Sequence, residues 1–143
     1  MALGRFGEMD VDPINVAEGL LVRIDGALTC DNTDGAPPLI VTGDAAESLE
    51  VMYPYQRLRE EGYDVDIAAP SRKTLRFVVH DFEPGYDTYT EKPGHRWNAD
   101  VALADVDPAD YVAIVVPGGR APEYLRNNAD AQRIVQVIGD DLE

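Results

Sequence analysis

The sequence predicts an α/β fold in which helices cover both faces of a parallel β-sheet. Short continuous runs of apolar residues alternate with segments that carry a helical apolar stripe, and this alternation is typical of strands buried on both sides. The clearest run, residues 111–116 (YVAIVV), ends in the turn-forming sequence Pro-Gly-Gly. A length of 143 residues fits one domain of this class.

Acidic residues dominate the charge of the chain. Twenty-seven Asp and Glu residues against 12 Lys and Arg residues give a net charge of −15, which repels phosphate backbones, so we expect no nucleic-acid partner. Ten of the basic residues are Arg, and Asp outnumbers Glu by 17 to 10. A high-salt source, where self-repulsion is screened, and a GC-rich genome are both open explanations of this composition.

The chain also lacks sequence signals for membranes and disulfides. No apolar run approaches the roughly 20 residues that cross a membrane, and the N-terminus (MALGRFGEMD) does not have the layout of a signal peptide. Cys30 is the single cysteine, which excludes an internal disulfide and a Cys-x-x-Cys metal site. We therefore expect a cytoplasmic location, no membrane partner, no metal and no other cofactor.

The first 37 residues read as an N-terminal extension and linker. Residues 31–38 (DNTDGAPP) are turn formers and chain breakers. Before them, residues 19–25 (GLLVRID) fit either a short strand or an arm that packs on a partner. Cys30 lies in or beside the linker, so we interpret it as a free small residue and not as a nucleophile.

Residues 38–143 carry the predicted α/β domain. The apolar run at residues 39–42 ends at Gly43 and predicts a buried strand. A helix is expected over residues 47–61, ended by Gly62, on the apolar stripe formed by Val51, Met52, Tyr55 and Leu58. Pro54 lies inside this segment, so the helix either starts there or is kinked.

The later elements follow the same alternation, with one interruption. Strands are expected at residues 64–69 and 111–116. A final helix is expected on the face formed by Ala131, Ile134, Val135, Ile138 and Leu142. Residues 80–95, within the irregular region 70–110, are aromatic, polar and rich in turn formers, which predicts a long loop with a functional role.

Two stretches carry a resemblance to a known family. Residues 39–65 (LIVTGDAAESLEVMYPYQRLREEGYDV) and 110–125 (DYVAIVVPGGRAPEYL) resemble the N-terminal part of the ThiJ/PfpI superfamily, which is class I glutamine amidotransferase-like. The segment 80–95, with its HDF and EKPGH sequences, is similar to the glyoxalase III-like subgroup. The resemblance implies a flavodoxin-like parallel sheet between helices, and a catalytic cysteine on a sharp strand-to-helix elbow followed by His.

The resemblance implies roles for residues at the ends of the strands. Glu47 matches a carboxyl group that hydrogen-bonds the cysteine sulfur and moves a proton. Its spacing alone favours an acid in the first turn of a helix, and it is the resemblance that favours the catalytic role. Gly118 and Gly119 match an oxyanion hole formed by backbone N–H groups. Without the resemblance they are a turn before a helix.

Four further residues are candidates. Glu123 matches a position that reaches the cysteine–histidine pair of a neighbouring subunit, and it also fits a first-turn helix acid. His95 is a candidate for proton transfer, while Arg120 and His80 are candidates for substrate binding. For both histidines the alternative is local hydrogen bonding, and two histidines without matching carboxylates do not predict a metal site.

The sequence to residue 143 does not include the family's Cys-His elbow. We therefore expect the N-terminal chain of a split or truncated enzyme that acts on small carbonyl substrates in the manner of glyoxalase III or a deglycase. A second polypeptide, or another copy in a dimer or higher oligomer, would supply the cysteine. The alternatives are a PfpI-type peptidase or hydrolase, a non-catalytic binding or regulatory module, and a phosphate-binding domain, which the acidic charge opposes.

Overall fold

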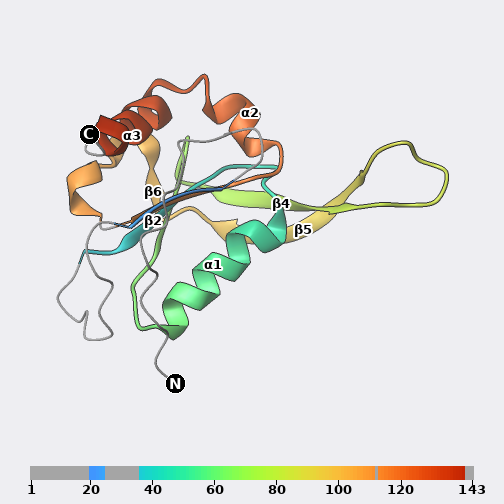
Figure 1. Ribbon diagram of the computed structural model, residues 1–143, viewed down its shortest axis with the longest axis horizontal. Coiled ribbons are helices and arrows are strands. Elements are labelled where there is room, and N and C mark those ends of the chain that lie inside the picture. The colour runs from blue at the N-terminus through green and yellow to red at the C-terminus, as the bar shows by residue number, and fades with distance from the viewer. Residues whose placement is uncertain (1–19, 25–35, 112, 141–143) are drawn as a thin grey trace.

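A five-stranded sheet forms the centre of the computed structural model, which describes residues 20–24, 36–111 and 113–140 (Figure 1). Three neighbouring pairs, β7–β2, β2–β3 and β3–β6, are parallel, and β1 pairs with β7 in the antiparallel direction. The α/β fold class is confirmed. The strands lie in the order β1 (Leu20–Ile24), β7 (Ala113–Pro117), β2 (Pro38–Val41), β3 (Asp66–Ala69) and β6 (Val101–Ala102).

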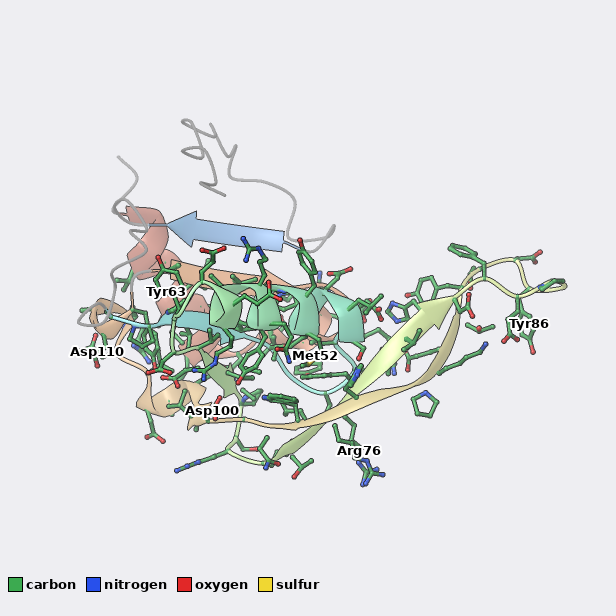
Figure 2. All side chains as sticks on the ribbon, turned by 90° about the horizontal axis from the view of Figure 1, so that it is seen from below. Met52, Tyr63, Arg76, Tyr86, Asp100 and Asp110 are labelled. Carbon is green, nitrogen blue, oxygen red and sulfur yellow. The ribbon has the colours of Figure 1, made fainter. Side chains whose placement is uncertain are left out.

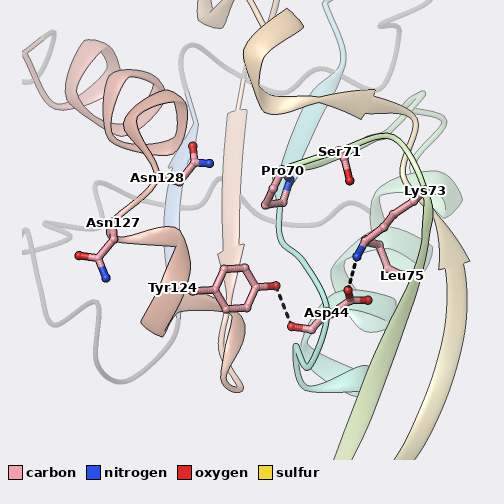
Figure 3. Close-up of a pocket in the computed structure, with 8 residues that line it drawn as sticks. All are labelled: Asp44, Pro70, Ser71, Lys73, Leu75, Tyr124, Asn127 and Asn128. Atoms are coloured by element: carbon pink, nitrogen blue, oxygen red, sulfur yellow. Dashed lines mark hydrogen bonds and ion pairs between the residues drawn. The ribbon is translucent and has the colours of Figure 1, made fainter.

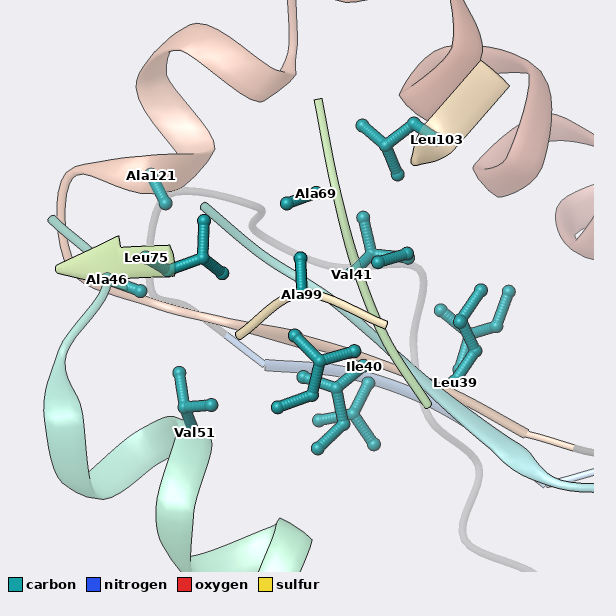
Figure 4. Close-up of a cluster of buried hydrophobic side chains, with 14 of the residues drawn as sticks. Leu39, Ile40, Val41, Ala46, Val51, Ala69, Leu75, Ala99, Leu103 and Ala121 are labelled. Carbon is teal, nitrogen blue, oxygen red and sulfur yellow. The ribbon is translucent and has the colours of Figure 1, made fainter. Parts of the chain in front are cut away.

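Helices cover both faces of this sheet. The helix α1 (Ser48–Glu60) lies on one face, whereas α2 (Ala121–Leu125) and α3 (Ala129–Asp140) lie on the other (Figure 1). Side chains from both layers meet the buried strands, as Figure 4 shows for Val51 of α1 on one side and Leu103 on the other. Two short 3-10 helices, η1 (Leu103–Asp105) and η2 (Pro108–Asp110), connect β6 to β7.

The helix α1 begins where the sequence predicts, at the residue after Glu47. The Glu47 side chain caps the helix by accepting a hydrogen bond from the Leu49 N–H, which satisfies one of the free donors of the first turn. The helix continues through Pro54, so the alternative that it starts at the proline is wrong. Val51 is fully buried, which contributes about 1.5–3 kcal/mol to the free energy of unfolding.

The prediction of a long loop at residues 80–95 is wrong for half of this segment, because residues 80–81 and 90–95 are in strands. The chain there forms an antiparallel hairpin of β4 (Thr74–Asp81) and β5 (Thr90–Asn98), which extends away from the sheet with Tyr86 near its tip (Figure 2). Leu75 and Phe77 alternate with exposed residues and are buried. This period of two is the strand signal, and the turn-rich composition of the following residues concealed it.

The N-terminal extension also contributes to the sheet, through β1. Of the two alternatives for residues 19–25, the strand is the one that forms. Cys30, most of the predicted linker and Leu142 lie outside the described residues. No helix in the described ranges is long and apolar enough to cross a membrane.

Candidate active site

The candidate site lies at the carboxyl ends of β2 and β7, where the following loops are joined by backbone hydrogen bonds. The Glu47 N–H donates to the Gly118 carbonyl at 3.2 Å, and the Arg120 N–H donates to the Ala45 carbonyl at 2.8 Å. On the other side of the first loop, the Val78 N–H of β4 donates to the Ala46 carbonyl at 2.9 Å. The loop after β2 is therefore held between β4 and the loop after β7.

Only glycine fits at position 119. Its φ of +88° lies in the left-handed region, which other residues rarely adopt. A Cβ atom there would lie 2.3 Å from the Glu47 backbone nitrogen and 2.8 Å from the Ala45 carbonyl oxygen. Among the described residues, the Gly119 N–H has no hydrogen-bond partner, which leaves a backbone donor free at the end of the strand.

Both carboxylate oxygens of Glu47 are held by backbone donors. Oε1 accepts from the Leu49 N–H of α1 at 3.3 Å, and Oε2 accepts from the His80 N–H of β4 at 3.3 Å. Glu47 is therefore the N-cap of α1, one residue before the first turn in which the alternative interpretation placed it. The second bond also fixes the Glu47 carboxylate between α1 and β4. The backbone of the same residue contacts the glycine turn, so this carboxylate lies near the carboxyl ends of β2 and β7.

Gly118 is bonded to a carboxylate that the sequence did not single out. Its N–H donates to Oε2 of Glu50 at 2.6 Å, so the N–H predicted to face an oxyanion already has an anionic acceptor. Glu50 lies three residues after Glu47, in the first turn of the helix that Glu47 caps, so both side chains are at the amino end of α1. The helical spacing was the signal that would have identified Glu50 as a second candidate.

The hairpin brings Arg120 and His80 to one carboxylate, that of Glu91. Arg120 binds Glu91 through two hydrogen bonds, each of 2.7 Å, and these bonds hold the pKa of Glu91 below its usual value. The His80 Nε2 lies 3.5 Å from the same carboxylate, and its ring contacts Tyr89 with centroids 4.4 Å apart. The guanidinium group of Arg120 is thus oriented by β5 before any substrate arrives.

His95 anchors the other strand of the hairpin to the start of α1. Its Nδ1 lies 2.6 Å from the Ser48 Oγ, and its backbone N–H donates to the same oxygen at 3.1 Å. Ser48 is fully buried, whereas His95 is exposed, so these bonds lie at the boundary between the core and solvent. Trp97 packs nearby on Tyr55 of α1, with ring centroids 5.0 Å apart, and fixes the base of the hairpin.

Most of the sequence matches one family of proteins. The profile of the DJ-1/PfpI family matches residues 38–141. This chain belongs to the DJ-1/PfpI family. The resemblance to the ThiJ/PfpI superfamily that the motifs suggested is confirmed, and the residues placed at the strand ends lie within the matched region.

Relatives of this DJ-1/PfpI chain come from plants and archaea. The protein DJ-1 homolog D of Arabidopsis thaliana is 42% identical over 101 residues, which cover 68% of this chain and 26% of that protein. A deglycase of Thermococcus kodakarensis is 37% identical over 103 residues, covering 72% of this chain and 54% of the deglycase. The chain thus spans about half of the archaeal relative and a quarter of the plant relative.

Solved structures share the fold of this DJ-1/PfpI chain. A two-domain protein of Anabaena variabilis with DJ-1/ThiJ/PfpI-like and ferritin-like domains aligns with a TM-score of 0.57 at 22% identity, over 73% of this chain and 27% of that one. A ThiJ/PfpI domain protein of Brachyspira murdochii aligns with a TM-score of 0.55 at 15% identity, over 76% and 56%. These neighbours support the flavodoxin-like arrangement.

Glu123 lies apart from the two carboxylates of α1. It is exposed on α2 and lines a shallow pocket of about 380 Å³ together with Arg120 and Tyr124. The structure therefore brings Glu123 beside Arg120 but does not join it to Glu47 by a hydrogen bond within the described residues. Its predicted role toward a neighbouring subunit stays a prediction.

A second pocket, of about 410 Å³, lies between α2 and the loop after β2 (Figure 3). Across it the Tyr124 hydroxyl donates to the Asp44 carbonyl at 2.8 Å, and Lys73 pairs with the Asp44 carboxylate at 2.5 Å. Burial raises the pKa of Tyr124 to about 12, so its hydroxyl stays a donor at neutral pH. These contacts hold the loop after β2.

In the described ranges no cluster of three or more metal-binding side chains occurs.

Proposed function

We propose that this chain is the N-terminal part of a cysteine-dependent DJ-1/PfpI enzyme that acts on small carbonyl compounds, with the cysteine supplied by a second polypeptide. The observation that carries the proposal is the position of Glu47 and Glu50 at the Gly118-Gly119 turn, where the Glu47 N–H donates to the Gly118 carbonyl and the Glu50 carboxylate accepts from the Gly118 N–H, at the carboxyl ends of two parallel strands. Parallel α/β sheets bind ligands at this end. Archaeal relatives named as deglycases support the substrate class.

The reaction we assign is the conversion of a 2-oxoaldehyde into a 2-hydroxy acid. The thiolate of the second polypeptide adds to the aldehyde carbon, and the carbonyl oxygen becomes an alkoxide, which then takes a proton. A carboxylate removes the proton from that carbon, and the neighbouring carbonyl carbon receives a proton through an enediol. The resulting thioester is hydrolysed by water, which releases the hydroxy acid and the thiol. One carbon is oxidised as its neighbour is reduced, so no external oxidant is needed.

The contacts of the chain suggest how its residues divide this work. The free N–H of Gly119 is the donor for the alkoxide, because backbone donors fixed where charge develops stabilise it most. Glu47 is held by two backbone donors from different elements and suits a fixed proton acceptor. Glu50 is exposed and has one such bond, so it can leave Gly118 and carry a proton.

His95 and the Arg120–Glu91 pair complete the proposed site. The His95 Nδ1 is occupied by Ser48, whereas its Nε2 has no partner in the described part of the chain and is the nitrogen available for proton transfer. Arg120 directly follows the glycine turn and its guanidinium group binds the Glu91 carboxylate, which His80 approaches as well. We assign Arg120 to holding a polar group of the substrate.

The test starts from the natively purified protein with every polypeptide that accompanies it. Mass spectrometry under denaturing conditions identifies the chains, and methylglyoxal consumption with lactate formation measures the activity. We expect a second polypeptide with a Cys-His sequence, and activity that is lost in Glu47→Gln and retained in Glu60→Gln, an exposed acid at the far end of α1. An assembly that contains the cysteine but leaves methylglyoxal unchanged overturns the proposal.

A further inference from the structure

The strand β1 occupies one edge of β7 along its whole length. The two strands are antiparallel, and β1 has no neighbour on its other side among the described strands. The amino end of β1 therefore lies beside the carboxyl end of β7, next to the Gly118-Gly119 turn. The pairs in register are Leu20–Pro117, Leu21–Val116, Val22–Val115, Arg23–Ile114 and Ile24–Ala113.

The topology of the sheet reserves this edge for a parallel strand. The parallel strands lie in the order β6-β3-β2-β7, which numbered along the chain is 3-2-1-4. In a doubly wound sheet of this order the next strand lies beside the fourth, which here is β7. Crossover connections between parallel strands are right-handed. A connection that leads toward one edge of the sheet therefore places its helix on one face, and a connection that leads toward the other edge places its helix on the opposite face. The helix α1, which leads from β2 to β3, lies on one face, and α3, which follows β7, lies on the other (Figure 1). The fold thus directs its next parallel strand to the edge that β1 holds.

The direction of the strand at this edge decides which of its two ends lies beside the glycine turn. A parallel strand beside β7 would end next to Gly118, and a residue on the turn after it would face Glu47 and Glu50. The antiparallel β1 brings its amino end there and continues away from the site. While β1 is paired with β7, no carboxyl end of a neighbouring strand reaches the glycine turn from this side.

We infer that β1 is a placeholder strand, which closes the edge of β7 until a parallel strand of a second polypeptide replaces it. The identity of the incoming strand as the one bearing the nucleophile rests on the proposed function. An unpaired β7 would expose a ladder of backbone groups in the apolar sequence AIVVP and would pair with other chains. A chain that folds before its complement arrives needs such a cover, which favours a separate polypeptide as the source.

A placeholder must also be able to leave without unfolding the sheet. The strand β1 is at the sheet edge and pairs with β7 alone, whereas β2 is central and its residues Leu39, Ile40 and Val41 are almost completely buried. Edge elements with few neighbours open locally at lower free energy than the core. Displacement of β1 therefore leaves the parallel strands β7, β2 and β3 in place.

A disulfide across β1 and β7 tests the inference on the full chain. Leu21 and Val116 are partners in register, and the Cα separation of such pairs is within the range a disulfide spans. The double variant Leu21→Cys, Val116→Cys, with Cys30→Ser to remove the natural thiol, is refolded together with a probe. This chain matches 54% of the Thermococcus kodakarensis deglycase, and the probe is the remaining part of that protein.

Sedimentation and native mass spectrometry then measure formation of a one-to-one complex. We expect the reduced variant to bind at least tenfold more tightly than the oxidised one, and Val22→Pro, which weakens β1, to bind more tightly than the natural sequence. Equal binding by the reduced and oxidised forms overturns the inference, as does no binding by either the reduced form or Val22→Pro. The readout is association and not activity, so failure of the proposed reaction leaves this result interpretable.

Hydrogen exchange of the chain alone gives a second measurement. The amides of β1 that pair with β7 are expected to exchange at least 100-fold faster than those of β2. Exchange of both strands at one common rate would make β1 part of the same cooperative unit, and a permanent strand cannot be a placeholder. This measurement needs no partner and no substitution.

Discussion

The backbone N–H of Gly118 donates a 2.6 Å hydrogen bond to the carboxylate of Glu50, across 68 residues of sequence. The bond connects the first turn of α1 to the glycine turn that follows β7. It also means that an anion approaching Gly118 meets a site already occupied by a carboxylate of the same chain. An anion can therefore bind this donor only after the Glu50 carboxylate has moved away.

Glu50→Gln separates the charge of this side chain from its hydrogen bond. The amide oxygen of Gln still accepts from the Gly118 N–H, so the melting temperature of the chain should change little. In the assembled enzyme the turnover of methylglyoxal should fall by about 100-fold or more, because an amide cannot carry the proton. Glu60→Gln on the same helix is the matched control, and unchanged turnover in Glu50→Gln would remove Glu50 from the site.

Gly119→Ala should destabilise the chain strongly. The added Cβ would lie 2.3 Å from the Glu47 nitrogen at a φ of +88°, and the combination of strain and overpacking predicts a loss of about 2–4 kcal/mol in the free energy of unfolding. Gly62→Ala is the control for strain alone, since its φ is +91° and nothing lies within 4 Å; it should cost about 1 kcal/mol. Urea unfolding of both variants checks the difference, and equal losses would show that the close approach is not limiting.

Glu91→Gln should remove a contribution to stability that depends on pH. The hydrogen bonds from Arg120 lower the pKa of Glu91 in the folded chain, so the ionised form is favoured by folding. The contribution is complete above the ordinary Glu pKa and is lost as the pH falls through the lowered folded value. The melting temperature of Glu91→Gln should lie below that of the natural chain at pH 7 and approach it at strongly acidic pH. A gap that stays constant across this range would contradict the ion pair.

Ser48→Ala should loosen the hairpin. The Ser48 Oγ is fully buried and binds both the ring and the backbone N–H of His95, so its removal takes both hydrogen bonds from β5, each worth about 0.5–1.5 kcal/mol. Hydrogen exchange in β5 should accelerate more than in β2. Ser71→Ala, an exposed serine in the turn before β4, is the control, and similar exchange in both variants would mean that Ser48 does not hold the hairpin.

The hairpin of β4 and β5 was not predicted from the sequence. Residues 74–77 have the alternation of a strand, but the pairing has a register shift between Arg76 and Val78, and Pro93 lies within the second strand. Proline and turn formers argue against strands unless the strand is an edge, and β4 and β5 form a two-stranded sheet in which both strands are edges. Only the pairing partner resolves this ambiguity.

The sequence alone determined the alternation of buried strands and amphipathic helices, and its PGGRAPE run indicated the family. These signals are local, because apolar periodicity and glycine turns depend on neighbouring residues. Only the tertiary structure decided that Glu50 binds Gly118, that Glu91 joins Arg120 to His80, and that β1 closes the edge of β7. Each of these contacts joins segments far apart in the chain, and their distances depend on how the helices and the hairpin pack around the sheet.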